Sequence, residues 1–581
     1  YPGSARELLE EVEVWISEVK VSLMEEIMQD ERQVDGWCEQ AWDDVHGKEL
    51  KMEDVRAGRA EEIGYMKSRN IWREVDLEEC FRVTGREPLS VKWVDTDKGT
   101  VEEPLVRCRL VARDFKGKDE KDREDLFAAT PPLELKRVLM SKAVTRRRKR
   151  QGVRKLLFID ARKAHLNPEC LKDVYIELPA EAGAGPGKCG KLVYWLYGCR
   201  EAAQAWEEHY SEKMEGVGFT RGTHSLVVFY HEEKGLSCVV HGDDFTFEGE
   251  AEDLKWIAEK MKEWFEVKIR GLLGPEEADD KEVTILGRVV KWKEWGIEYQ
   301  ADPRHRKLIM EYFGFDETTR ALQNNGGKEE EEGDDEFLGG EEAKSYRGTA
   351  ARLNYMAQDS PGIMFGTKEA CRGMANPTRG DFRRLKKVAK FLVGRLAEVW
   401  RFVWQEEGQS VLVYTDSDWA GCRKTRKSSS GGLLMLGSHC IKAWCSTQGA
   451  LALSSAEAEY YSLVEGVLRA RGLQNIGKEI GMDGTEESVK LKVMIDSSAA
   501  KAFVSKRGSG KMRHIEVKWL WLQEEVRKGR VEVGKVRGDL NPADLMTKYL
   551  NVKEIEQRLA SMSIGLEVRD EKVVQEVVRE S

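Results

Sequence analysis

Two adjacent aspartates, Asp243 and Asp244, lie in a stretch whose residue types could do chemistry. Apolar residues run from Cys238 to Val240, Gly242 directly precedes the acids, and alternating apolar residues follow. This pattern predicts a β-hairpin with the acids at its tip. Adjacent carboxylates repel each other unless a cation lies beside them, and Mg²⁺ prefers carboxylate oxygens. An Asp-Asp pair is also ordinary turn chemistry, so the pair alone does not decide between these interpretations.

A third acid, Asp160, ends the stretch 156–159, which is apolar on both faces and therefore predicts a buried strand. A carboxylate at the end of a buried strand costs desolvation unless it is paired or bound to a metal. We therefore expect Asp160 to join Asp243 and Asp244. The basic run 144–155 comes just before this strand. Such runs are usually solvated, but this one is the strongest local signal for a polyanion in the chain.

The second half of the chain contains four further acids, each on a different predicted element: Asp416, Glu459, Asp496 and Asp544. Ser454 and Glu457 predict a capping box at a helix start, which gives Glu457 a structural role and leaves Glu459 free to serve a site. A single acid at a strand end or helix start is commonly a cap. Four acids in this order are much harder to explain as caps.

The elements around these acids follow from periodicity and turn residues. Helical spacing predicts helices in 4–45 and 55–67, and strand alternation predicts a hairpin over 89–115. Arg107, Arg109 and Arg113 lie on or near one strand of that hairpin, where phosphate contact and a solvated face remain equally open. The acidic, Gly-rich stretch 316–345 predicts a disordered linker. The basic stretch 381–388 lies on a predicted helix with a face suited to nucleic acid.

The composition limits the number of domains and the classes of protein to which the chain can belong. A chain of 581 residues with 41% hydrophobic residues predicts roughly three or four packed domains. The net charge of −10 gives no general support for nucleic-acid binding, which then needs local basic clusters. The 11 cysteines include no CxxC pair, which argues against a zinc site or a disulfide framework and suits a reducing compartment. No apolar run reaches membrane-spanning length and no signal peptide is seen, and because the chain begins with Tyr1 we interpret it as a piece of a longer product.

In their joint order these motifs resemble the reverse transcriptase–ribonuclease H portion of copia-type LTR retrotransposon polyproteins, over about residues 40–550. The family patterns, in chain order, match these segments: "KARLVARGF" at 107–115, "DVKTAFLNG" at 160–168, "YGLKQAPRAW" at 197–206, "YVDD" at 241–244, "DSDWAG" at 416–421, "RKSTTG" at 426–431, "SSTEAEY" at 454–460, "KHIDIKYHF" at 513–520 and "NPADLMTK" at 541–548. Protease and integrase segments are not seen.

The resemblance implies a multidomain α/β and α+β fold, with a right-hand polymerase (fingers, palm, thumb) followed by a ribonuclease H-like α/β domain. The expected segments are an N-terminal helical segment at 1–45, fingers and palm at 46–270, thumb and connection at 271–400, a ribonuclease H-like domain at 405–550 and a C-terminal tail at 551–581.

The resemblance also implies a function: copying RNA into DNA and degrading the RNA of the hybrid. Asp160, Asp243 and Asp244 would hold two Mg²⁺ ions, and Asp416, Glu459, Asp496 and Asp544 would hold two more, with Mn²⁺ as a substitute. The remaining expected contacts are Arg109, Arg113 and His165 to the nucleotide, and Arg426, Lys427 and Ser428 to nucleic acid. The implied partners are an RNA template, a DNA primer, the RNA–DNA hybrid, deoxynucleoside triphosphates and other polyprotein segments, with no membrane.

Some residues depart from the family pattern. His165 replaces an aromatic residue that excludes ribose, His241 replaces a Tyr, and Glu201 replaces a Gln. An alternative is therefore a decayed or domesticated fragment that binds nucleic acid without turnover, and a third possibility is that only the ribonuclease H is active. The expected location is cytoplasmic, in a virus-like particle, with a later nuclear step.

Overall fold

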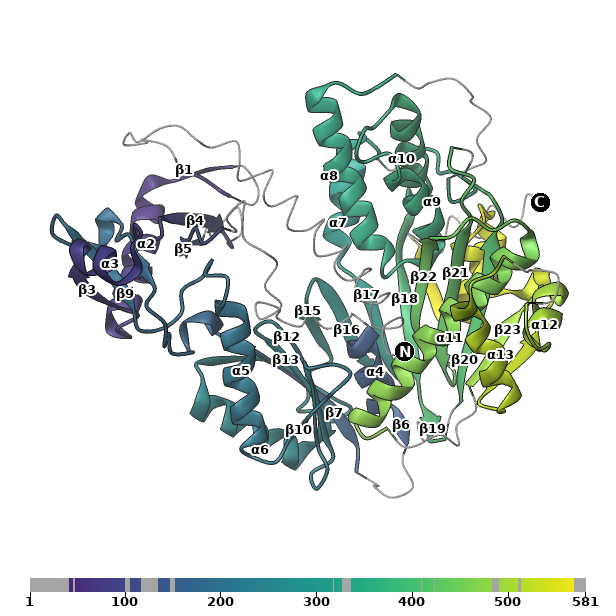
Figure 1. The fold of residues 1–581 in the computed structure, drawn as a ribbon, viewed down its shortest axis with the longest axis horizontal. Helices are drawn as coiled ribbons and strands as arrows, with labels where there is room; N and C mark the ends of the chain where they lie inside the picture. The colour runs from purple at the N-terminus through teal and green to yellow at the C-terminus, as the bar shows by residue number, and fades with distance from the viewer. Residues whose placement is uncertain are drawn as a thin grey trace.

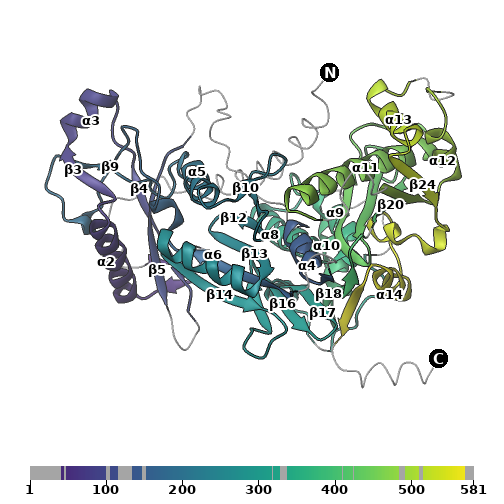
Figure 2. The same ribbon diagram turned by 90° about the horizontal axis from the view of Figure 1, so that it is seen from below.

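The computed structural model describes residues 41–44, 48–99, 105–115, 134–146, 152–316, 318–326, 336–408, 410–422, 424–482, 491–509 and 514–568. The helix predicted within 4–45 therefore falls almost wholly outside the described residues, as do most of the linker acids, at 327–335. Within the described part, the chain is a mixed α/β molecule with several sheets, spread out between an N-terminal unit at one end and a C-terminal sheet at the other (Figures 1 and 2).

The N-terminal unit contains the predicted helix and hairpin. The hairpin β4–β5 is antiparallel, and its buried residues Cys108 and Leu110 alternate with exposed arginines. A second sheet in this unit has the order β3-β9-β8. The bounds are β1 Ala41–Trp42, β2 Glu49–Leu50, α2 Met52–Ser68, β3 Trp72–Asp76, α3 Leu77–Thr84, β4 Val91–Asp97, β5 Val106–Ala112, β8 Tyr175–Ile176 and β9 Lys188–Leu192.

A six-stranded sheet of order β10-β11-β12-β13-β7-β14 occupies the middle of the molecule. Helices α5 and α6 pack on one of its faces, against residues such as Ile159 and Phe245, while α4 packs on the other against Phe158. The bounds are α4 Glu134–Ala143, β6 Thr145–Arg146, β7 Arg154–Ala161, α5 Ala202–Glu215, β10 Thr220–Arg221, β11 Val228–His231, β12 Leu236–His241, β13 Asp244–Glu250, α6 Ala251–Trp264 and β14 Val267–Leu273.

The next segment combines a five-stranded antiparallel sheet, β15-β16-β17-β18-β25, with helices α7 to α10 and α14. Its last strand comes from the C-terminal end of the described chain, where β25 pairs with β18. The bounds are β15 Glu282–Ile285, β16 Arg288–Lys293, β17 Gly296–Ala301, α7 Pro303–Tyr312, α8 Gly340–Ala357, α9 Pro361–Cys371, α10 Arg379–Phe391, β18 Arg395–Val403, β19 Gln405–Glu406, α14 Val552–Ser561 and β25 Ile564–Val568.

The C-terminal sheet has the order β22-β21-β20-β23-β24. Strands β22, β21 and β20 are antiparallel, whereas β20, β23 and β24 run parallel. Helix α11 packs across β20 and β21. The bounds are β20 Val411–Asp418, β21 Ser429–Leu436, β22 His439–Thr447, α11 Ser455–Glu479, β23 Leu491–Ile495, α12 Ser498–Val504, α13 Trp521–Arg527, β24 Val531–Lys535 and the 3-10 turn η6 Pro542–Met546.

Two expectations about segments change with the structure. Residues 340–345, expected in the linker, form the first turns of α8. Residues 552–568, expected in a tail, form α14 and β25 and complete the sheet next to β18. Both segments fold because they bury apolar side chains, such as Ala343 and Ile555, that the acidic composition around them concealed. The other domain boundaries stay predictions.

The core is continuous from α4 to the C-terminal sheet. Arg137 of α4 donates to the carbonyl of Ile441 in β22 at 3.3 Å, and Lys142 donates to the carbonyl of Ile480, just after α11. Buried basic side chains need such acceptors because an unpaired one is costly. The middle and C-terminal sheets are therefore joined through α4.

Two candidate metal centres

The first acid cluster is formed by two neighbouring strands of the middle sheet. Strands β7 and β13 are antiparallel and place Asp160 directly opposite Asp244. Gly242, with φ of +65°, and Asp243 form the turn between β12 and β13, and the Ala161 amide donates to the Asp243 carbonyl at 2.8 Å. A positive φ is costly for other residues, which explains a glycine here. The strand register thus places Asp160 beside Asp244, with Asp243 in the adjoining turn.

Arg270 lies between two of these acids. It sits at the bulge in β14, between Ile269 and Gly271, where the ladder to β7 shifts register. Its Nη2 lies 3.1 Å from Asp160 Oδ2, and its Nε lies 3.5 Å from Asp244 Oδ1. The guanidinium therefore offsets the repulsion between the carboxylates through the same oxygens that would bind a cation.

A buried lysine of α4 lies near the same cluster, on the face of the middle sheet opposite α5 and α6. Lys136 of α4 is 5% exposed, and its Nζ has no hydrogen-bond partner among the described residues. Burial lowers the pKa of Lys136 to about 8, while Asp244 opposes that fall. Burial raises the pKa of Asp244, and Lys136 and Arg270 counteract the rise. The first cluster thus combines carboxylates with two basic side chains.

Two of the predicted nucleotide contacts lie close together. The guanidinium of Arg109 lies 5.5 Å from the ring centre of Tyr197, and the His165 ring lies 5.4 Å from the same ring. Partial burial raises the pKa of Asp243, and Arg109 is among the cations that oppose the rise. Burial lowers the pKa of His165, so its ring is neutral near pH 7. Arg113 is exposed just beyond the end of β5.

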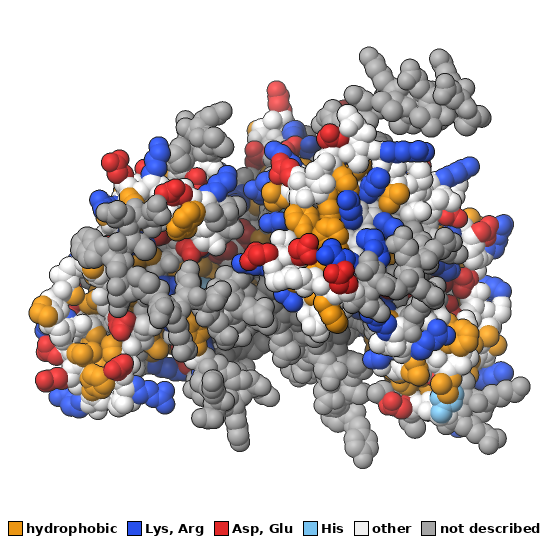
Figure 3. All heavy atoms as spheres, turned by 90° about the horizontal axis from the view of Figure 1, so that it is seen from above, with side chains coloured by type: hydrophobic (Ala, Val, Ile, Leu, Met, Phe, Trp, Pro, Cys, Tyr) orange, Lys and Arg blue, Asp and Glu red, His pale blue; other side chains and the backbone are white. Residues whose placement is uncertain are grey.

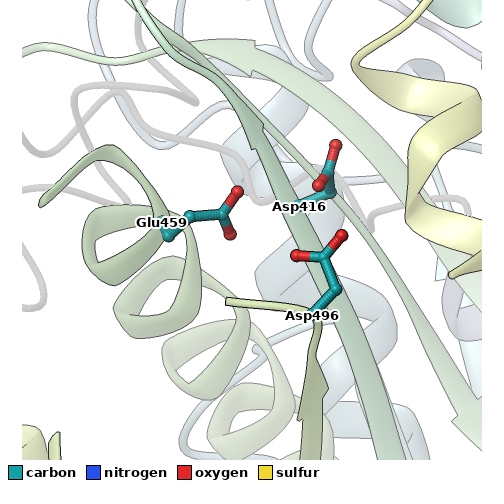
Figure 4. A group of neighbouring side chains, drawn as sticks. All are labelled: Asp416, Glu459 and Asp496. Carbon is teal, nitrogen blue, oxygen red and sulfur yellow. The ribbon is translucent and has the colours of Figure 1, made fainter. Parts of the chain in front are cut away.

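The second cluster lies at the carboxyl end of the parallel pair β20–β23. Tyr414 pairs with Met494, and each of these strands continues to an acid two residues later. Asp416, Glu459 and Asp496 bring one carboxylate oxygen each to within 4.8 Å of one another, and Figure 4 shows Glu459 reaching the two aspartates from its helix. Three separate elements therefore supply one compact group of oxygens.

The fourth acid, Asp544, is joined to this group through a lysine. Lys548 Nζ lies 2.6 Å from Asp544 Oδ1 and 3.3 Å from Asp416 Oδ2. Arg558 Nη2 contacts the other oxygen of Asp544 at 2.8 Å, and the Thr547 hydroxyl donates to Asp416. Asp544 is thus next to the three-acid group, with both of its oxygens engaged by basic side chains.

The chemistry of the second cluster fits a hard divalent cation. Burial raises the pKa of Asp416 and of Glu459, and each acid's neighbouring carboxylates raise it further. Glu459 Oε2 is buried without a hydrogen-bond partner among the described residues, while Oε1 accepts from the Ser417 amide at 3.2 Å. Buried carboxylates that repel one another and leave an oxygen unsatisfied are suited to Mg²⁺ or Mn²⁺.

The first cluster lies within a segment that matches a known protein family. Residues 69–275, which include Asp160, Asp243 and Asp244, match the family model described as reverse transcriptase (RNA-dependent DNA polymerase). The chain is 24% identical over 485 residues to the retrovirus-related Pol polyprotein from transposon TNT 1-94 of Nicotiana tabacum, covering 80% of this chain and 35% of the relative. The corresponding polyproteins from transposons RE1 and RE2 of Arabidopsis thaliana are 24% and 23% identical, each over 79% of this chain and over 30% and 31% of the relative.

Over most of its length this chain is therefore similar to copia-type Pol polyproteins. It spans about a third of the length of the curated relatives it matches. The match to the reverse transcriptase family covers residues 69–275 and the first cluster, whereas the second cluster lies outside these residues. Among the described residues, every helix is too short or too polar to cross a lipid bilayer.

Some contacts predicted from the sequence are corrected by the structure. Arg154 and Lys155, expected in a polyanion-binding run, are buried in ion pairs with Glu248 and Asp279 because they lie within β7. Ser428 is fully buried, and its hydroxyl accepts from the Ala420 amide at 3.0 Å, which leaves it no surface for nucleic acid. These polar groups hold the fold together.

Three further predictions concern the loop before β21, the start of α11 and the basic run before β7. Arg426 is exposed and Lys427 half-buried on the loop before β21. Ser454 caps α11 as predicted, but Glu457 accepts from the Leu453 amide at 3.0 Å instead of closing the box on Ser454. Arg147 to Arg150 lie outside the described residues.

Sequence reasoning missed three basic residues at the clusters: Arg270, Lys136 and Lys548. Lys548 stands four residues after Asp544 within a motif that was identified, so its spacing was an available signal. Arg270 and Lys136 gave no local signal, because a strand bulge and the packing of a helix under a sheet are properties of the tertiary structure.

Proposed function

We propose that this chain is the RNA-directed DNA polymerase and ribonuclease H portion of a copia-type polyprotein. The observation that carries the proposal is the register that sets Asp160 opposite Asp244, with Asp243 in the adjoining turn. In this proposal the middle sheet is the palm, the β4–β5 hairpin belongs to the fingers, and α7–α10 with the β15–β18 sheet form the thumb and connection.

In the polymerase site, Asp160, Asp243 and Asp244 would hold two Mg²⁺ ions. When bound, such ions activate the primer 3′-hydroxyl and stabilise charge on the phosphates. Arg109, exposed on β5 beside Tyr197, would bind the phosphates of the incoming nucleotide, with Arg113 just beyond the end of that strand. The neutral ring of His165 would lie against the sugar.

The order of the C-terminal sheet supports a ribonuclease H. Three antiparallel strands lead into two parallel ones, and the acids gather at the carboxyl end of the first parallel pair. Asp416, Glu459 and Asp496 would hold the metal ions there, with Asp544 alongside. The 2′-hydroxyl would select the RNA strand.

Primer extension on an RNA template with Mg²⁺ tests the polymerase. We expect extension by the full chain and its loss in Asp243→Asn, while Asp496→Asn extends normally. Extension that persists in Asp243→Asn would contradict the proposed polymerase activity.

Cleavage of a labelled RNA–DNA hybrid tests the nuclease with the same pair of variants. We expect Asp496→Asn to stop cleavage and Asp243→Asn to preserve it. A decayed fragment would instead bind the hybrid in a salt-sensitive manner without either activity. Cleavage without any extension by the unmodified chain would indicate that only the nuclease is active.

The proposed partners follow from this chemistry: RNA template, DNA primer, their hybrid, deoxynucleoside triphosphates and the other segments of the polyprotein. We propose the cytoplasm, within a virus-like particle, as the place of synthesis, followed by a nuclear step.

A further inference from the structure

Helix α10 is unusually basic for a chain with a net charge of −10. Its 13 residues include six Lys or Arg and a single acid, Asp381. That acid is buried in the helix cap, where it accepts from the Thr378 amide at 3.0 Å. The acid therefore serves the capping box and does not neutralise the outer face of the helix.

Three lysines form the outer basic face of α10: Lys386, Lys387 and Lys390. Lys386 is exposed, and the other two are half-buried. Among the described residues, none of the three has an ion pair with a carboxylate. Lys386 and Lys390 are four residues apart, a spacing at which like charges destabilise a helix.

The contrast with α6 shows that this arrangement is not general in the chain. On α6, Lys260 pairs with Glu263 at 2.8 Å and Lys262 pairs with Glu259 at 2.9 Å. A helix face of lysines without acids is suited to a polyanion, whose phosphates would relieve the repulsion. Figure 3 shows Lys and Arg side chains gathered around apolar ones on the face of the molecule that contains α8 and α10.

Basic side chains of α9 and its C-terminal cap continue from α10 to the edge of the second acid cluster. Arg372 Nη2 donates to Thr447 Oγ1 at 3.2 Å, and Lys368 Nζ donates to Ser429 Oγ. Ser429 and Thr447 are directly opposite each other in the ladder, and Ser429 also lies opposite Asp418. Lys368 and Arg372 therefore lie at the strand ends that border Asp416, where both also pair with Glu369, at 2.7 Å and 3.3 Å.

Arg384 of α10 pairs with Asp381 of the same helix. Burial lowers the pKa of Arg384, and the neighbouring Tyr549 and Cys422 oppose that shift. Tyr549 directly follows Lys548, the lysine that contacts Asp416 and Asp544. Arg384 and the basic groups of α9 thus lie between the outer face of α10 and the second cluster, each paired with an acid.

We propose that the basic face of α10 (Lys386, Lys387 and Lys390) binds the phosphate backbone of the RNA–DNA hybrid whose scissile strand lies at the second acid cluster. The inference rests on the proposed ribonuclease H function and adds a binding surface outside both the acid cluster and residues 69–275. The ligand class is a nucleic-acid duplex, because the face offers point charges without a pocket for a base.

Hybrid binding by the full chain in EDTA tests this inference, using fluorescence anisotropy of a labelled RNA–DNA duplex over a salt series. We expect the triple variant Lys386→Gln, Lys387→Gln, Lys390→Gln to bind roughly tenfold or more weakly, with a salt slope lower by about 2–3 for three lost phosphate contacts. The matched control is the triple Lys→Gln variant of the α6 lysines 255, 260 and 262, which should retain the slope of the unmodified chain.

Two results would overturn the inference: an α10 variant whose affinity and slope stay within roughly twofold of the unmodified chain, or an α6 variant that loses as much of both. Thermal unfolding of both variants checks that they fold. Because binding is measured without metal, its outcome is separate from turnover. Loss of binding in the α10 variant, with no cleavage by the unmodified chain, would remove the nuclease function and keep the binding surface.

Discussion

The guanidinium of Arg270 lies 3.1 Å from the Asp160 carboxylate, and it also reaches Asp244 at 3.5 Å. Arg270 comes from a strand bulge, whereas Asp160 and Asp244 face each other across the adjoining ladder. Because the ion pairs use the oxygens that would hold a divalent cation, arginine and metal compete for the same ligands.

Replacing Arg270 by Gln should therefore have opposite effects with and without metal. In EDTA we expect stability to fall by about 0.5 kcal/mol, since Arg270 is 41% exposed and solvent screens its charge. With Mg²⁺, stabilisation should begin at a lower metal concentration. Thermal melts over a Mg²⁺ series measure both effects. Arg162→Gln, which removes an exposed pair with Glu266, is the control, and melts for Arg270→Gln that match it at every metal concentration would contradict the prediction.

We expect the neutral ring of His165 to lie against the sugar of the nucleotide and to exclude ribose by its bulk. Burial lowers its pKa, and its ring contacts Tyr197, so its bulk is held in place. We expect His165→Ala to raise incorporation of ribonucleotides relative to deoxynucleotides by about tenfold, and His165→Phe to leave the ratio nearly unchanged. The ratio of kcat/KM values for the two nucleotide types is the measurement. An unchanged ratio in His165→Ala would show that another residue excludes ribose.

Lys548 should matter for the nuclease alone. It lies between Asp544 and Asp416 and orients both carboxylates. We expect Lys548→Met to lower hybrid cleavage by roughly 10- to 100-fold, as is usual for groups that position metal ligands, and to leave primer extension intact. Lys553→Met, an exposed lysine on α14, is the matched control. Equal loss of both activities in Lys548→Met would instead indicate a general folding defect.

Glu398 should make stability depend on pH. It is buried in β18, both of its carboxylate oxygens accept from the Gly362 amide, and burial raises its pKa from 4.5 to about 8. Between these values the folded chain keeps a proton that the unfolded chain releases. Stability is therefore lost as pH rises, by about 1.4 kcal/mol per pH unit, and the loss levels off near pH 8.

Glu398→Gln removes this titration while it keeps an acceptor for Gly362. The difference in free energy of unfolding between Glu398→Gln and the unmodified chain should grow from about pH 5 to about pH 8 in favour of the variant. Denaturant unfolding at several pH values measures it. A difference that stays constant with pH would mean that Glu398 is ionised in the folded chain.

The acids of both clusters could be predicted because their signal is local. A carboxylate that ends an apolar strand must be paired or bound to a cation, and this holds for Asp160 and Asp416 wherever their strands pack. The hairpin at Asp243 could also be predicted from neighbouring residues, since Gly242 supplies the positive φ of the turn. The burial of Arg154, Lys155 and Ser428 could not be predicted from their neighbours in the sequence. A basic run or a polar loop has the same sequence pattern whether it faces solvent or a buried partner.

By itself the sequence determined which residues end strands, which turns are tight and where acids gather, since alternation of apolar and polar residues and glycine geometry act over a few neighbours. Only the tertiary structure decided which strands lie side by side, and so which basic groups meet the acids. Asp160 faces Asp244 through a ladder that joins distant segments, and Arg270 reaches both through a bulge in a third strand. Such contacts depend on register across the sheet, which a stretch of residues does not encode alone.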